Sequence, residues 1–204
     1  MLNRRTLLNW LLASLPLLLA LGWTFLAFNS EADVYRFMLQ HRAAHPDLKA
    51  AAKLVTNWGN AVMYPIYAWL LITGLRRGDR GRVRLAVVYI IVQLVISLAL
   101  VNILKYLIGR PRPDVEGLFR SMSSRAGYHS MPSGHTTEIS GAVLPLAIRA
   151  RSTAAALGMG LYVGMVAYSR VYLGWHHPSD VACGWMLGSV AALAIHLFSH
   201  EDRT

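Results

Sequence analysis

Cysteine and charge are both scarce in this sequence. Its 204 residues include one cysteine, Cys183, which lies inside an apolar run. Neither an internal disulfide nor a cysteine-based metal site can therefore form. Only 15% of the residues are charged, compared with about 25% in an ordinary soluble protein. No internal repeat, low-complexity segment or long linker is present, and the length suits one compact domain.

Apolar residues are abundant instead. They make up 55% of the chain, and the mean hydropathy is +0.40, whereas about 45–50% is usual for a soluble domain. In a soluble protein the net charge of +10 would suggest nucleic-acid binding. Here the basic residues fall in loops between apolar runs, and no basic groove interleaved with aromatic residues is visible. We therefore expect a protein that binds the bilayer and no nucleic acid.

Six apolar segments predict an all-α bundle of six transmembrane helices, in a single integral-membrane domain covering residues 1–204. The segments lie at about 7–28, 51–75, 83–107, 135–148, 153–172 and 179–198. Most approach the ~20 residues that are needed to cross ~30 Å of hydrocarbon. Between the third and fourth segments, Pro111, Pro113 and Gly117 stop helix formation and predict a structured outer loop.

The first segment could also be a signal peptide, because Arg4 and Arg5 precede it. Its apolar stretch is longer than the 7–15 residues typical of such a signal, and no small-residue cleavage site ends it. We therefore favour a retained membrane helix.

Arginine placement predicts the orientation. Residues 76–84 hold five arginines in nine positions, which is a dense cytoplasmic anchor. The basic pairs at 4–5 and 149–151 fall on the same side, whereas the longer connections at 29–49 and 109–131 also carry acidic residues. Both termini should then be cytoplasmic, in a bacterial-type inner membrane. The oligomeric state is not predicted.

Basic side chains and helix starts predict an anion site at the outer face. Lys105 and Arg112 flank the end of the third segment, and arginine offers a planar fork that matches phosphate oxygens. Ser133, Gly134 and His135 stand at the start of the fourth segment. Glycine lets the backbone approach a ligand closely, and the free N–H groups of a helix N-terminus favour anions.

A third polar segment supplies a nucleophile. Arg170 closes the fifth segment, and His176 stands four residues before Asp180. That spacing predicts that imidazole and carboxylate share one helical face. A carboxylate bonded to one ring nitrogen leaves the other nitrogen free to attack, while His135 can protonate a leaving oxygen. No carboxylate cluster is available for Mg²⁺, so the cations would replace a metal.

The three segments match known family signatures in order and in spacing. The signatures are K-x6-RP, PSGH and SR-x5-H-x3-D, and they stand here at residues 105–113, 132–135 and 169–180. The chain resembles the type 2 phosphatidic acid phosphatase family of integral-membrane lipid phosphatases over about residues 7–198. Members act on phosphatidylglycerophosphate, undecaprenyl diphosphate or lipid A.

The resemblance implies a mechanism that needs no metal or other cofactor. His176 would attack phosphorus to form a phosphohistidine, His135 would protonate the leaving group and then activate water, and Asp180 would orient His176. The residues that would hold the phosphate are Lys105, Arg112, Ser133, Gly134 and Arg170. The expected substrate is a lipid mono- or diphosphate of the undecaprenyl diphosphate or phosphatidylglycerophosphate class.

Other functions stay open. The same site could transfer phosphate to another lipid. A transporter fits loosely, although no paired segments suggest the inverted repeats common in that class. A catalytically silent lipid-binding member is a third alternative, against which the intact signatures argue.

Several polar residues have no assigned role. His177 is expected to be structural or at the rim of the site, and His129 to be solvated in its loop. Glu138, one turn beyond His135 in an apolar helix, is either functional or a structural partner. Arg110 and Arg120 are either loop charges or contacts for a second phosphate.

Overall fold

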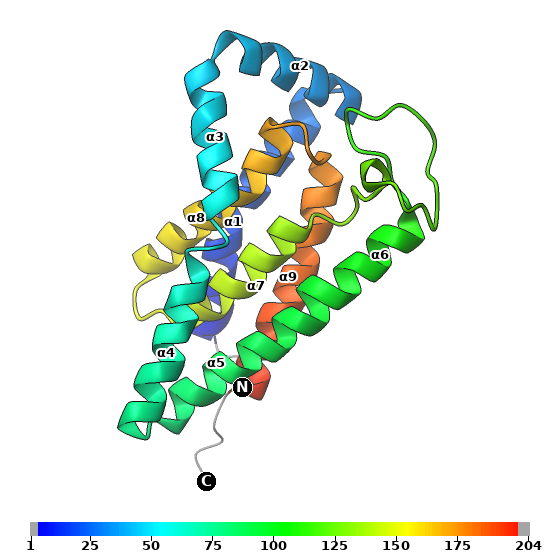
Figure 1. Cartoon of the computed structure of the whole chain (residues 1–204). Helices are drawn as coiled ribbons and strands as arrows, with labels where there is room; N and C mark the ends of the chain where they lie inside the picture. The colour runs from blue at the N-terminus through cyan, green and yellow to red at the C-terminus, as the bar shows by residue number, and fades with distance from the viewer. Residues whose placement is uncertain (1–3, 200–204) are drawn as a thin grey trace.

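The computed structural model describes residues 4–199, and every regular element in that range is helical (Figure 1). The α-helices are α1 (Arg4–Ala27), α2 (Glu31–Ala44), α3 (Pro46–Trp58), α4 (Met63–Arg77), α5 (Arg80–Val92), α6 (Val101–Ile108), α7 (Gly134–Ile148), α8 (Thr153–Tyr172) and α9 (Pro178–Phe198). A π-helix, η1 (Gln93–Leu100), joins α5 to α6, and a single 3₁₀ turn, η2 (Ala126–Tyr128), lies in the following loop. The predicted all-α class is confirmed for the described residues.

Four helices within residues 4–199 are long and apolar enough to cross a membrane. They are α1, the continuous helix Arg80–Ile108 built from α5, η1 and α6, and the helices α8 and α9. The predicted count of six is not confirmed. Helix α7 has only 15 residues, and the predicted span at 51–75 is divided into two shorter helices.

The division of segment 51–75 occurs at residues 59–62. Helix α3 ends at Trp58 after 13 residues, and α4 starts at Met63. The break turns Asn60 toward α7, where its Nδ2 donates to the His135 carbonyl at 3.3 Å. The Gly59 carbonyl, which the break frees from helical bonding, accepts from the Tyr162 hydroxyl at 2.6 Å. Partners outside the segment therefore compensate for the lost helical bonds.

The expectation of a loop at 29–49 was wrong, because α2 and the first turn of α3 occupy it. Ser30 caps α2 by accepting from the Asp33 backbone N–H, and Pro46 begins α3. Both are ordinary signals of a helix start. Helix α2 was not predicted because its residues are too polar to form an apolar segment.

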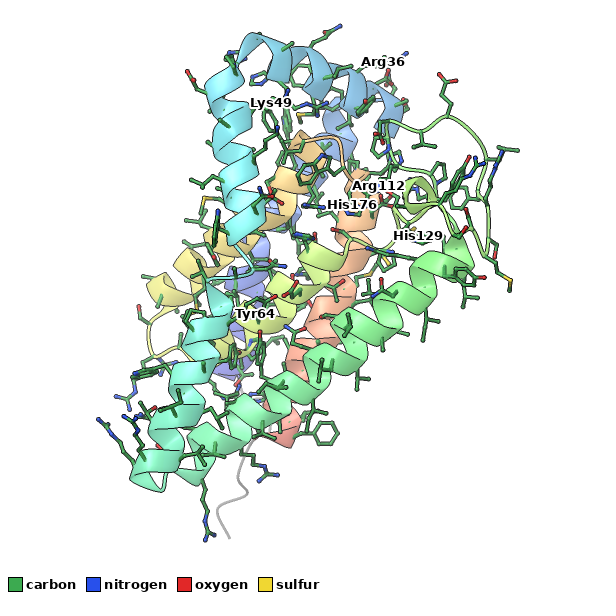
Figure 2. The ribbon with its side chains drawn as sticks, in the orientation of Figure 1. Arg36, Lys49, Tyr64, Arg112, His129 and His176 are labelled. Atoms are coloured by element: carbon green, nitrogen blue, oxygen red, sulfur yellow. The ribbon has the colours of Figure 1, made fainter. Side chains whose placement is uncertain are left out.

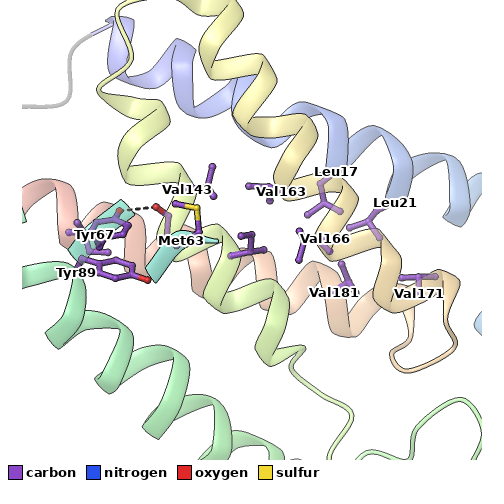
Figure 3. Close-up of a cluster of buried hydrophobic side chains, with 14 of the residues drawn as sticks. Leu17, Leu21, Met63, Tyr67, Tyr89, Val143, Val163, Val166, Val171 and Val181 are labelled. Carbon is purple, nitrogen blue, oxygen red and sulfur yellow. Dashed lines mark hydrogen bonds between the residues drawn. The ribbon is translucent and has the colours of Figure 1, made fainter. Parts of the chain in front are cut away.

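Helix α7 lies at the centre of the bundle, in contact with α1, α8 and α9 (Figure 1). Eleven of its 15 residues are buried. Valines of α7, α8 and α9 form the core together with Leu17 and Leu21 of α1 (Figure 3). A helix too short to span the bilayer is thus held by neighbours rather than by lipid.

The polar segments and the arginine-rich segment lie at opposite ends of the bundle. The 109–133 loop and the α8–α9 connection lie toward the α2 end and α7 starts on the side that faces them, whereas the α4–α5 turn lies at the far end (Figure 1). Arg84 at that far end donates from Nε to the Phe198 carbonyl at 2.8 Å. The predicted separation of the two kinds of segment is present in the fold.

Helices α7 and α9 approach closely at Gly188. A Cβ placed there would lie 2.4 Å from Ser140 Cβ and 2.7 Å from the Thr137 carbonyl oxygen. We expect Gly188→Val to destabilise the protein by about 1–3 kcal/mol, because overpacking forces the helices apart. Thermal unfolding in detergent measures the loss. Gly158→Val is the matched control, since a Cβ there meets nothing within 4 Å, and equal unfolding temperatures for the two variants would contradict the expected close packing.

Candidate active site

The three polar segments meet at one end of α7. Lys105 lies in the last turn of α6, Arg170 in the last turn of α8, and His176 in the short connection before α9. Figure 2 shows Arg112 and His176 close together beneath the α2 end of the bundle. Lys105 and His176, which are 71 positions apart in the sequence, therefore share one site.

The start of α7 links the other segments. Ser133 is the N-cap of α7, and its backbone N–H donates to the Asp180 carbonyl at 3.0 Å. Gly134 lies under Lys105, because a Cβ placed on Gly134 would be 3.4 Å from Lys105 Nζ. The N–H groups of this helix end therefore lie beside a lysine ammonium, an arrangement that attracts anions.

His135 stands among the positive charges. Lys105, Arg112 and Arg170 all lie close enough to act electrostatically on its imidazole, as does His176. The eight residues predicted for the site are thus brought together, although their roles in catalysis stay a prediction. Such a concentration of cations around two histidines favours a phosphate ligand.

Arg170 is held in place from two sides. Its Nη1 donates to Thr56 Oγ1 of α3 at 2.9 Å, and its Cζ lies 4.4 Å from the centroid of the Trp175 ring. The Nε atoms of Arg170 and Arg112 are buried and have no hydrogen-bond partner within residues 4–199. Thr56 had no sequence signal, because it lies in the apolar segment that turned out to be α3.

His176 and Asp180 are neighbours, but not on one helical face. Asp180 is in the first turn of α9, which begins at Pro178, and His176 precedes the helix. The predicted geometry was therefore wrong, although the predicted pair is present. His176 Nδ1 lies 3.6 Å from Asp180 Oδ2, which is longer than a hydrogen bond. Both side chains are buried, and Nδ1 has no hydrogen-bond partner among the described residues.

Asp180 is held by other donors. Its Oδ2 accepts from Ser130 Oγ at 2.5 Å and from the His177 backbone N–H at 2.9 Å, and its Oδ1 accepts from Arg110 Nη1 at 2.6 Å. Arg110 also donates from Nη2 to Glu31 of α2 at 2.5 Å. Arg110 therefore bridges the carboxylates of Asp180 and Glu31. These contacts fit a structural role and not the expected alternative of a contact for a second phosphate.

Breaking this bridge is expected to disturb the Asp180 carboxylate beside His176. We expect Arg110→Gln to lower kcat by about tenfold or more with a smaller change in KM, because the variant leaves the buried Asp180 without its cation. Arg110→Lys should recover only part of the activity, since a lysine cannot donate to both carboxylates as a planar fork. Steady-state kinetics with a lipid phosphate measures both effects.

Arg120→Gln is the matched control for the Arg110 variants. Arg120 is exposed and lies 5.1 Å from the centroid of the Tyr128 ring, with no carboxylate partner within residues 4–199. Its replacement should change kcat less than twofold or so. Equal losses from the two arginines would contradict a specific role for the Arg110 bridge.

Burial governs the protonation of His176. Desolvation lowers the pKa of His176 to about 4, the positive charge of Arg170 acts in the same direction, and the neighbouring Asp180 opposes both. The imidazole is therefore neutral at pH 7 and keeps the lone pair that a nucleophile needs. The Arg170 charge also makes this side of the pocket favourable for an incoming anion.

A histidine titration tests this protonation state. In a spectrum of histidine-labelled protein, we expect the resonances that disappear in His176→Gln to titrate near pH 4. The ordinary histidine pKa is about 6.5, so a midpoint at that value would show that His176 is not desolvated.

Two further histidines have structural contacts. His177 Nε2 lies 3.2 Å from the Pro111 carbonyl oxygen, so this residue ties the loop to α9 at the rim of the site. His129 Nε2 lies 2.7 Å from the Ser123 carbonyl oxygen within the loop. The structural role, one of the two expected for His177, is therefore present, whereas His129 bonds to the protein rather than standing free in solvent.

Between residues 4 and 199 no group of three histidine, cysteine, aspartate or glutamate side chains is placed to hold a metal ion. The positive charges that surround the two histidines come from lysine and arginine.

Several known proteins are similar to this chain. An undecaprenyl-diphosphatase of Sulfolobus acidocaldarius is 30% identical over 135 residues, which cover 65% of each chain. A lipid A 1-phosphatase of Rhizobium etli is 36% identical over 49% of this chain and 44% of its own length. A decaprenylphosphoryl-5-phosphoribose phosphatase of Mycobacterium tuberculosis is 34% identical over 48% of this chain and 52% of its own.

Each of these matches covers less than two thirds of the relative's own length. No solved structure matches significantly. The profile of the PAP2 superfamily matches residues 84–203, a range that contains all three polar segments and more than half of the chain. The chain therefore belongs to the PAP2 superfamily.

Proposed function

We propose that this protein is a metal-independent lipid phosphatase. It removes a terminal phosphate from a membrane lipid mono- or diphosphate, of the undecaprenyl diphosphate or phosphatidylglycerophosphate class, through a phosphohistidine on His176. The relatives support the general activity, because each is named as a phosphatase of a lipid-linked phosphate. Four helices within residues 4–199 are long and apolar enough to cross a membrane, which is where such substrates lie.

The observation that carries the proposal is a pair of arginine Nε donors at the site that have no partner among the described residues. The Nε donors of Arg112 and Arg170 are buried without hydrogen-bond partners, and buried donors are costly unless a ligand or solvent satisfies them. Both lie beside His135. A tetrahedral phosphate accepts hydrogen bonds in several directions, so it suits these donors and the α7 N-terminus together.

The reaction follows from the two imidazoles. His176 attacks phosphorus through Nε2, the ring nitrogen remote from Asp180, and the bond to the leaving lipid oxygen breaks as that oxygen takes a proton from His135. Burial and the neighbouring cations lower the pKa of His135 to about 3, so the substrate brings this proton, which passes from a phosphate oxygen to His135 on binding. Neutral His135 then takes a proton from water, whose oxygen displaces His176 and releases phosphate. Lys105, Arg112 and Arg170 neutralise charge on the non-bridging oxygens throughout.

A phosphate-release assay with EDTA tests the proposal. We expect the purified protein to release phosphate from at least one lipid in a panel of phosphatidylglycerophosphate, undecaprenyl diphosphate and phosphatidic acid, with EDTA present. Phosphate release that requires added divalent metal would overturn the cation-only site. A panel with no released phosphate under either condition would overturn the phosphatase proposal itself.

We also propose that the site faces the outside of the cell and that both chain ends are cytoplasmic. The arginines at 76–84 support this orientation, since cytoplasmic loops are enriched in basic residues. Single cysteines placed at Arg80 or Arg120, in a Cys183→Ala background, can be labelled in intact cells with an impermeant thiol reagent. Labelling at position 120 alone is expected, and labelling at position 80 alone would reverse the topology.

A further inference from the structure

A second site opens between α4, α7 and the α5–η1 helix. It is a groove of about 370 Å³, lined by Tyr64, Tyr89, Ile90, Gln93, Leu94, Ser97, Leu98 and Glu138. None of the residues assigned to the phosphate site lines it. Leu94 and Leu98 are 54% and 57% exposed at its edge, so in a membrane the groove opens toward hydrocarbon.

Glu138 is the one charged residue among those that line this groove. Asn60 Nδ2 donates to its Oε2 at 2.6 Å, and the Tyr64 hydroxyl donates to its Oε1. Figure 2 shows Tyr64 well below His176, toward the α4–α5 turn. No ion pair among residues 4–199 includes Glu138. An ionised carboxylate inside a membrane protein is normally stabilised by a cation, and the protein supplies only neutral donors here.

Asn60 adds a further acceptor beside Glu138. Both contacts of its Nδ2 are to acceptors, the Glu138 carboxylate and the His135 carbonyl, so the amide orientation is determined by the network. Its Oδ1 is then a buried acceptor without a hydrogen-bond partner among the described residues, and the side chain is 7% exposed. Asn60 is not among the residues that line the groove, so the Glu138 carboxylate is the charged acceptor that the groove itself presents to a ligand with N–H donors.

The π-helix η1 forms one wall of the groove. Four of the eight lining residues, at positions 93, 94, 97 and 98, belong to η1. Gln93 Nε2 donates to the Glu138 carbonyl at 2.9 Å, and Ser97 donates to Gln93 Oε1. π-Helical segments are rare and occur frequently at functional sites. The π-helix η1 therefore packs against α7 at Glu138, the residue whose carboxylate has no ion-pair partner among residues 4–199.

We propose that this groove binds the ammonium head of an amphiphilic amine. The positive nitrogen pairs with Glu138 and lies among the aromatic side chains of Tyr64 and Tyr89, which attract cations. The alkyl chain extends along Ile90, Leu94 and Leu98 toward the bilayer. A bare metal ion fits less well, because hard cations take six or more oxygen ligands and much of this lining is apolar.

Equilibrium binding of radiolabelled decylamine to the purified full-length protein in detergent tests the proposal, with decanol as the uncharged match. We expect saturable binding of decylamine and none of decanol. Glu138→Gln should lower the affinity about tenfold or more, which corresponds to about 1.4 kcal/mol. Glu116→Gln, a change in the exposed loop, should bind like the wild type. His176→Ala should also bind normally, which separates this site from the proposed phosphatase activity.

A second variant serves if Glu138→Gln fails to fold. Leu94→Trp keeps the carboxylate and fills the groove from its lipid-facing edge, so it should also abolish saturable decylamine binding. Decanol binding equal to that of decylamine would overturn the proposal, because it would show simple partition into an apolar crevice. Unchanged decylamine binding in both variants, or its displacement by millimolar sodium or potassium, would overturn it as well.

Discussion

Replacing His176 by alanine is expected to lower phosphate release by a factor on the order of 10⁴ or more. The nucleophile is lost, and covalent catalysis fails as a whole when its attacking group is removed. The cations and the α7 N-terminus remain, so lipid phosphate should still bind, and KM should change far less than kcat. Single-turnover kinetics with a lipid phosphate measures the chemical step directly.

His177→Ala is the matched control for His176→Ala. The two histidines are adjacent in sequence. His177 contacts Asp180 through its backbone N–H and not through its ring, which bonds to the Pro111 carbonyl. Its replacement should cost less than about tenfold in kcat. A larger loss from His177→Ala than from His176→Ala would exchange the roles of the two residues.

Replacing His135 by alanine is expected to lower release from a lipid phosphate by about 10²–10⁴-fold, the usual contribution of a general acid or base. The result should depend on the leaving group. With p-nitrophenyl phosphate, whose phenolate leaves without a proton, phosphorylation of His176 should stay fast while hydrolysis by water is slow. We therefore expect a burst of nitrophenolate equal to the amount of enzyme, followed by slow turnover.

The burst distinguishes His135 from a residue that only binds phosphate. Lys105→Ala removes a phosphate-binding cation nearby, and it should slow both steps without a burst. An identical loss with lipid and nitrophenyl substrates, and no burst, would contradict the assignment of His135 as the proton donor.

The convergence of the site could be predicted from sequence because its parts stand at helix ends. Lys105, Ser133 and Arg170 each lie where an apolar run begins or stops. Because successive helices run in opposite directions, the end of one and the start of the next lie at the same end of a bundle. The structure has this arrangement, with Ser133 as the N-cap of α7 and Arg170 in the last turn of α8. Five of the six apolar segments correspond to α1, the continuous α5–η1–α6 helix, α7, α8 and α9, and only the segment at 51–75 is divided.

Contacts between segments could not be predicted. Arg110 bonds to Glu31 and Asp180, which are 79 and 70 residues away, and no local pattern records such a pairing. The four-residue spacing between His176 and Asp180 predicted the pair correctly, but on the assumption that both lie on one helix. In the structure Asp180 is in the first turn of α9 and His176 precedes that helix. The turn at 59–62 depends on α7 and α8 for its partners, which an apolar run does not reveal.

Trapping the covalent intermediate is the most direct test of catalysis through His176. The protein is mixed with a lipid whose terminal phosphate carries ³²P, quenched in alkali within milliseconds, and digested for mass spectrometry. We expect label that is stable in alkali and lost in acid, as for a phosphorus–nitrogen bond, on the peptide that contains His176, and none in His176→Ala. Phosphate release at the normal rate with no labelled protein, or label on another residue, would contradict nucleophilic attack by His176.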